Sequence, residues 1–147
     1  MRIILKNKET LLYDDFIFKC SIGKKGLTQN KIEGDLKTPR GIYTLGPLFY
    51  RSDRNIKIFK KLKKIKIQKD MGWCDDINSP FYNKLIKINK KIKCEKLHRK
   101  NNNYDLFIPI NYNYLKPKKN KGSAIFLHLT NDYKKTLGCI AIKKKDM

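Results

Sequence analysis

The sequence predicts a mainly β protein folded as one domain over residues 1–147. Three observations lead to this prediction. Short apolar runs alternate with polar residues at the period of a strand, Gly, Pro and Asn recur between these runs, and no amphipathic pattern lasts for three helical turns. With 147 residues, of which 40% are hydrophobic, the chain is long enough to bury a core.

The first half of the chain contains the shorter predicted strands. Residues 2–5 and 10–13 flank a polar turn and predict a pair of strands. Residues 16–22 alternate between apolar and polar side chains, which is typical of a half-buried strand. Residues 42–45 form another short apolar run that is entered and left through glycine and proline, so we expect a fourth strand there.

The second half contains the more apolar runs. The basic segment 56–68 ends in a strand-like alternation, and residues 85–92 repeat that pattern. Residues 104–110 and 123–129 are the most continuously apolar, so we expect them to be the central, buried strands. A polar loop at 116–122 separates them, and neither an internal repeat nor a linker divides the chain.

The net charge of +22 suggests a polyanionic partner, such as nucleic acid, anionic lipid or a wall polymer. The basic residues are nevertheless spread along the whole chain, and no basic arm, RNA-binding aromatic motif or zinc-finger spacing is present. Lys, Ile and Asn are abundant together, which is typical of an AT-rich coding sequence. We therefore favour a compositional origin and expect no specific nucleic-acid partner.

The N-terminal residues lack the pattern of a signal peptide, because Lys6, Lys8 and Glu9 interrupt the apolar start. No apolar run is long enough to span a bilayer. We therefore expect a cytoplasmic protein, or a periplasmic or cell-wall protein if another route exports it. In the cytoplasm the four cysteines are expected to be reduced thiols. The sequence does not indicate an oligomeric state.

A cysteine and a histidine near the C-terminus are the first candidate site. The apolar run 124–127 leads to His128, and Cys139 follows eleven positions later (139 − 128), directly after Gly138. A histidine that reaches a thiol can activate it as a nucleophile. Backbone N–H groups around Gly138 and Cys139 would then bind the oxyanion, and Thr136 would shape the loop. On the pair alone, the simpler interpretation is a core cysteine beside an unrelated histidine.

A metal site is the second candidate. Cys94 and His98 are four residues apart, and Cys20 and Cys74 are the further thiols available to join them. Zinc sites usually contain paired short spacings such as C-x2-C, which this chain lacks. We therefore predict no metal site.

The third candidate is the segment 72–76, Gly-Trp-Cys-Asp-Asp, which is unusual in so basic a chain. Trp73, Asp75 and Asp76 fit two interpretations equally well. They line a cleft that binds an amine-bearing substrate, or the tryptophan fills the core while the aspartates form turns.

Several ordered motifs resemble the YkuD-type L,D-transpeptidase catalytic domain, in particular a compact subgroup with GWCDD and TxGCxA motifs. The resemblance extends from about residue 23 to residue 141. The matching blocks are EGDLKTPRG at 33–41, Tyr50, GWCDD at 72–76, YN at 82–83, YD at 104–105, GSAIFLH at 122–128 and TLGCIA at 136–141.

The resemblance implies a compact β-sandwich or barrel-like fold with a few short helices, in which Cys139 is the nucleophile and His128 the base. In this family a backbone carbonyl near the cysteine motif often orients the histidine. The implied substrate is a peptidoglycan stem peptide or muropeptide, cut between the L-centre of a diamino acid and the following D-Ala. The acyl group then passes to an amine, which forms a 3–3 crosslink, or to water, which makes the enzyme an L,D-carboxypeptidase. No cofactor is implied.

Three features depart from the family pattern. Ala141 stands where many members have Arg or Asn, no export signal is present, and relatives usually continue beyond the cysteine motif into a helix and a strand. A cytoplasmic member would rather trim muropeptides with water as acceptor. A shortened C-terminus would leave Cys139 less well supported, so a catalytically degenerate basic binding module is a further alternative.

Overall fold

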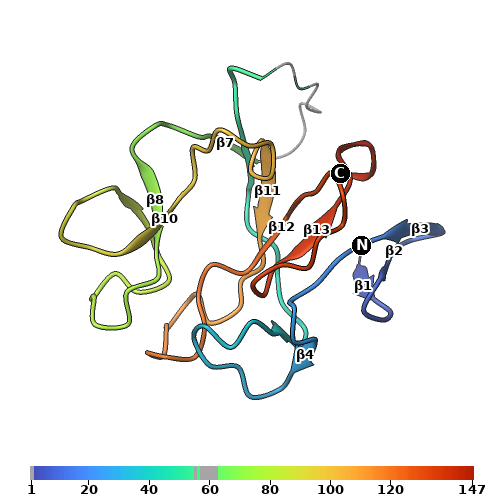
Figure 1. The fold of residues 1–147 in the computed structure, drawn as a ribbon, viewed down its shortest axis with the longest axis horizontal. Helices are drawn as coiled ribbons and strands as arrows, with labels where there is room; N and C mark the ends of the chain where they lie inside the picture. Colours follow the sequence, from blue (N-terminus) through green and yellow to red (C-terminus); the bar gives the residue numbers. More distant parts are fainter. Residues whose placement is uncertain (1, 55, 57–62) are drawn as a thin grey trace.

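The computed structural model describes residues 2–54, 56 and 63–147, and this part of the chain is mainly β, as predicted (Figure 1). Its one helical segment is the short 3-10 helix η1 (Lys144–Asp146), and it contains no helix long and apolar enough to cross a membrane. The strands are β1 (Ile3–Leu5), β2 (Thr10–Tyr13), β3 (Phe16–Lys19), β4 (Leu27–Thr28), β5 (Thr38–Pro39), β6 (Leu48–Tyr50), β7 (Lys64–Lys66), β8 (Met71–Cys74), β9 (Leu85–Lys87), β10 (Cys94–Lys96), β11 (Leu106–Pro109), β12 (Phe126–Leu129) and β13 (Ile140–Ile142).

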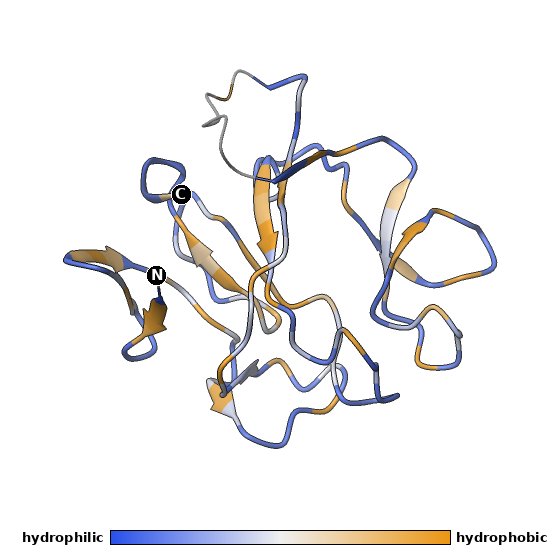
Figure 2. Cartoon of the chain, turned by 180° about the vertical axis from the view of Figure 1, so that it is seen from behind, coloured by the Kyte–Doolittle hydropathy of each residue, from blue (hydrophilic) through white to orange (hydrophobic). Residues whose placement is uncertain are grey.

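A mixed five-stranded sheet with the order β13-β12-β11-β6-β7 forms the centre of the fold. The β12–β13 and β6–β7 pairs are parallel, and the other pairs are antiparallel. The two segments with the most continuous apolar character, 104–110 and 123–129, contain β11 and β12. This confirms the prediction that they are the central strands, and Figure 2 shows them as the hydrophobic middle of the molecule.

The two faces of this sheet bury different clusters. Phe126 packs on one face against Trp73 and Tyr104, whereas Leu127 faces a second cluster that includes Ile140 and Cys20. This alternation follows from the two-residue period of a strand. His128, two residues after Phe126, therefore lies on the Trp73 side, where its ring meets the edge of Tyr104 at 5.4 Å between centroids.

Three smaller sheets surround the central one. β8 lies between β9 and β10 and brings Trp73 onto the core. β1, β2 and β3 form an antiparallel sheet beside the N-terminus, and β4 pairs with β5 in parallel (Figure 1).

Three predicted strands differ from the structure in extent or position. In segment 16–22 the strand ends at Lys19 and Phe16 is 63% exposed, whereas Cys20 and Ile22 are buried in the core and Phe18 packs against it. Segment 42–45 is not a strand: Leu45 forms an isolated bridge with Ile110 and the Gly46 N–H donates to the Pro109 carbonyl. Pro47, which has no N–H to donate, separates these contacts from β6. Segment 85–92 is a strand only over β9, and part of segment 56–68 lies outside the described residues.

Candidate active site

A pocket of about 980 Å³ opens beside the end of β12 and collects most of the residues singled out by the sequence. It is lined by Asp75, Asp76, His128, Thr136, Gly138 and Cys139. Residues from four separate segments of the chain therefore meet in one place, and Trp73 is absent from the lining.

The pairing of β12 with β13 brings His128 and Cys139 to the same face of the sheet. His128 is in register with Ala141, and Leu127 with Ile140. Cys139 precedes Ala141 by two residues, and it packs in the same core cluster as Phe126. Cys139 thus directly precedes β13, on the same side as His128 of the adjacent parallel strand β12, and both residues line the pocket.

The thiol of Cys139 is held by the backbone that leads into β12. Its Sγ donates to the carbonyl of Ala124 and accepts from the N–H of Phe126, both at 3.3 Å. Burial raises the pKa of this thiol to about 12, and the nearby carboxylate of Glu95 adds to the effect. The Cys139 side chain is therefore a protonated thiol at neutral pH.

His128 is fixed in one tautomer. Its Nδ1 lies 2.8 Å from the carbonyl oxygen of Leu129, which only accepts hydrogen bonds, so Nδ1 carries the proton and Nε2 keeps its lone pair. Burial lowers the pKa of His128 to about 4, so the ring is neutral near pH 7. The orienting carbonyl belongs to the next residue of the histidine's own strand, whereas the family resemblance implied one near the cysteine motif.

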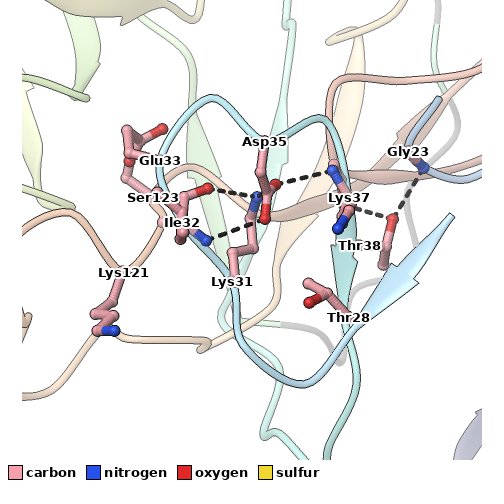
Figure 3. A network of polar contacts seen from close by, with 12 residues as sticks. Gly23, Thr28, Lys31, Ile32, Glu33, Asp35, Lys37, Thr38, Lys121 and Ser123 are labelled. Carbon is pink, nitrogen blue, oxygen red and sulfur yellow. Dashed lines mark hydrogen bonds and ion pairs between the residues drawn. The ribbon is translucent and has the colours of Figure 1, made fainter. Parts of the chain in front are cut away.

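The loop that carries the thiol is clamped by two threonines. Thr38 Oγ1 donates to the Gly138 carbonyl at 2.8 Å and accepts from the Gly23 N–H at 2.9 Å (Figure 3 shows the second contact). Thr136 Oγ1 donates to the carbonyl of Cys139 at 2.6 Å and accepts from the Gly138 N–H. Thr38 of the segment 33–41 thus supports the loop of Cys139 directly.

Both the surroundings and the backbone conformation at position 138 favour glycine. Its φ is +150°, and a Cβ there would lie 3.0 Å from the carbonyl oxygen of Lys37. The Gly138 N–H, which we expected to bind an oxyanion, is already donated to Thr136. Among the described residues the N–H of Cys139 has no acceptor, so it is the backbone donor that remains.

A network that the sequence analysis did not identify forms the opposite wall. Tyr104 and Arg99 both donate to Glu95 Oε1 at 2.5 Å, and the Arg99 guanidinium lies 4.1 Å from the centre of the Tyr104 ring. All three line the pocket with Cys139 and His128. The Tyr-Asp block at 104–105 was the one sequence signal for this network. The other two members come from outside the quoted motifs: β10 supplies Glu95, and the loop after β10 supplies Arg99.

Trp73 is a core residue, and its expected place in the cleft wall is wrong. Its side chain is 3% exposed, contacts Phe49 and Phe126, and donates from Nε1 to Asn83 Oδ1 at 2.9 Å. Asn83 Oδ1 also accepts from the N–H of Ala124, whose carbonyl binds the thiol. Trp73 therefore supports the site indirectly, through the hydrogen bonds that join Asn83 to Trp73 and to Ala124.

The two aspartates that follow Trp73 do line the pocket. Asp76 Oδ1 accepts from the N–H of Asn78, so this residue also forms the turn that the alternative interpretation predicted. Asp75 Oδ2 lies 3.6 Å from Lys93 Nζ, and Asp75 Oδ1 is buried without a hydrogen-bond partner in the described part of the chain. Asp75 thus places a carboxylate at the pocket wall.

The cysteines considered for a metal site lie in different places. Cys94 and Cys74 face each other across β10 and β8, whereas Cys20 belongs to the cluster on the other face of the central sheet. Within the ranges that the structure describes, no three His, Cys, Asp or Glu side chains group closely enough to hold a metal ion.

Comparison with known proteins gives one match. The family model YkuD, described as an L,D-transpeptidase catalytic domain, matches residues 2–147. No curated protein and no solved structure matches the chain.

Proposed function

Since the chain belongs to the YkuD family of L,D-transpeptidase catalytic domains, we propose that it is a peptidoglycan crosslinking enzyme with a cysteine nucleophile. In this proposal Cys139 attacks the bond between the L-centre of a diamino acid and D-Ala in a tetrapeptide stem. The supporting observation is that Cys139, the residue before β13, and His128 of the paired strand β12 line one pocket.

The first half-reaction follows from the tautomer of His128. Its free Nε2 accepts the thiol proton as the sulfur bonds to the peptide carbonyl carbon, and the carbonyl electron pair moves onto the oxygen. When that pair returns, the C–N bond breaks. The imidazolium then gives its proton to the departing nitrogen. D-Ala leaves, and the acyl group remains as a thioester on Cys139.

Both groups are neutral at rest, because burial disfavours the thiolate and the imidazolium alike. Proton transfer is therefore expected to accompany the attack on bound substrate rather than to precede it. A buried thiol of this kind reacts slowly with solvent-borne reagents, and this protects it between turnovers.

The acceptor half-reaction is assigned to an amine. Asp75 and Asp76 line the same pocket as the thiol, and one carboxylate oxygen of Asp75 lacks a partner among the described residues. A protonated side-chain amine of a second stem is attracted to these carboxylates as it approaches, and it releases one proton to solvent before it attacks. Attack of the deprotonated amine on the thioester gives the 3–3 crosslink and restores the thiol, whose proton returns through His128.

The test is incubation with purified tetrapeptide muropeptide, followed by mass spectrometry. We expect loss of D-Ala and formation of a crosslinked dimer with the wild-type protein and with Cys94→Ala, and neither product with Cys139→Ala. Tripeptide without dimer would assign water as the acceptor and make the protein an L,D-carboxypeptidase. Release of D-Ala by Cys139→Ala would refute the mechanism.

A non-catalytic basic binding module would behave differently. It would bind anionic polymer with a steep dependence on salt concentration and would leave the tetrapeptide intact. A carbapenem separates the two cases, since a competent thiol is acylated by it and a binding module is not. Selective acylation of Cys139 is the expected result.

A further inference from the structure

Lys31 is a buried cation in the pocket of the nucleophile. It lies in the loop between β4 and β5, is 4% exposed, and lines the pocket together with Cys139. Its Nζ forms an ion pair with Asp35 Oδ1 at 2.5 Å, as Figure 3 shows. Asp35 in turn accepts from the N–H groups of Ile32 and Lys37, so the carboxylate is fixed on its own loop.

Two glycines make room for this side chain. A Cβ on Gly122 would lie 2.9 Å from Cγ and Cε of Lys31, and a Cβ on Gly138 would lie 3.6 Å from its Nζ. The lysine stem therefore passes over Gly122, and the ammonium ends beside the residue that precedes the nucleophile. Glu33 anchors the same loop by accepting from Ser123 Oγ at 2.8 Å and from the Tyr82 hydroxyl.

The ammonium has a donor to spare. Of its three N–H groups, one is taken by Asp35, and a second has the Ile32 carbonyl at 3.5 Å. The third has no acceptor among the described residues. A buried donor without an acceptor is costly, so this position favours an oxygen arriving from the pocket.

We propose that Lys31 supplies the charged donor of the oxyanion site, opposite the free N–H of Cys139. A substrate oxygen that accepts a hydrogen bond from Nζ, at about 2.8 Å, would lie next to Gly138, where no side chain occupies the space. This inference rests on the proposed function, since it concerns the oxyanion formed when Cys139 attacks the carbonyl. The Asp35 carboxylate positions the ammonium, and the ion pair leaves the third N–H available.

The experiment compares Lys31→Met with Asp35→Asn. Lys31→Met removes the charge and keeps most of the stem, whereas Asp35→Asn weakens the same ion pair but retains the ammonium. Two rates are measured for each protein at saturating reagent: acylation of Cys139 by a carbapenem, which passes through an oxyanion, and alkylation of Cys139 by iodoacetamide, which does not. D-Ala release from the tetrapeptide provides kcat and KM separately.

We expect Lys31→Met to slow acylation and kcat by about 100-fold or more, while alkylation falls much less. Asp35→Asn should retain acylation within about 5-fold, because a hydrogen-bonded ammonium remains. If Lys31→Met proves unfolded, the double variant Lys31→Met/Asp35→Asn removes the unpaired carboxylate and should show the same slow acylation.

Three results would overturn the assignment. Equal losses of acylation and alkylation in Lys31→Met would show that the lysine only holds the loop, and so would equal losses in the two single variants. Near-normal acylation in Lys31→Met would exclude any catalytic part. A wild-type protein that neither releases D-Ala nor reacts with the carbapenem would instead refute the proposed function, and this assignment with it.

Discussion

Protonation of His128 should destabilise the fold, because the imidazole is buried as a neutral ring. Its pKa is about 4 in the folded chain against an ordinary value of 6.5. Between these values the unfolded chain binds a proton that the folded chain does not. The stabilisation is therefore complete above pH 6.5 and is lost as the pH falls towards 4. The full difference is on the order of 3 kcal/mol, most of which is lost by pH 4.5.

The measurement is urea unfolding of the wild-type protein and of His128→Gln at about pH 7.5 and about pH 4.5. Carboxylates titrate in both proteins, so the difference between the two pH dependences isolates the histidine. We expect the wild type to lose about 2–3 kcal/mol more than the variant. His98→Gln, which removes the other imidazole, controls for the general effect of losing a histidine. Equal losses in wild type and His128→Gln, or an NMR titration of the His128 ring near pH 6.5, would refute the reasoning.

Three further predictions concern the thiol and the loop that carries it. Thr38→Val should lower the free energy of unfolding by about 1–3 kcal/mol for each buried group that it leaves unpaired, as judged by urea denaturation, whereas Thr38→Ser should stay close to wild type. Gly138→Ala should abolish carbapenem acylation, because its Cβ meets the Lys37 carbonyl. The control is Gly34→Ala, where nothing lies within 4 Å of the added Cβ. It should retain acylation, at a stability cost of about 1–3 kcal/mol for the positive φ. Iodoacetamide should modify the partly exposed Cys94 before the buried Cys139, and peptide mass mapping that showed the reverse order would contradict a protonated resting thiol.

The parts of the site that sequence could predict are those encoded locally. Cys139 and Gly138 are adjacent in the sequence, and the apolar run that ends at His128 correctly indicated a buried strand. The same local logic identified β11 and β12 as central strands, because continuous apolar character is what burial on both faces requires.

The parts that sequence could not predict depend on contacts between distant segments. A single tryptophan before two acids is equally compatible with a cleft wall and with a buried core position. The hydrogen bond of Trp73 to Asn83, which holds the side chain in the core, joins residues ten positions apart. Phe16 has the pattern of a half-buried strand, but its side chain is exposed because the core lies at the other end of segment 16–22, around Cys20 and Ile22. Lys31 stood unremarked among many lysines, although its place just before the Glu-Gly-Asp block was the available signal.

The bond from Thr38 to the carbonyl of Gly138 joins residues 100 positions apart. The loop of Cys139 therefore takes its final shape only after these two distant segments have met, which is among the costliest loop closures in this fold. A ribosome-bound chain would contain nearly the whole sheet before it had a working thiol. In a refolding experiment, recovery of carbapenem acylation should lag behind recovery of Trp73 fluorescence, so that chemical competence marks the end of folding.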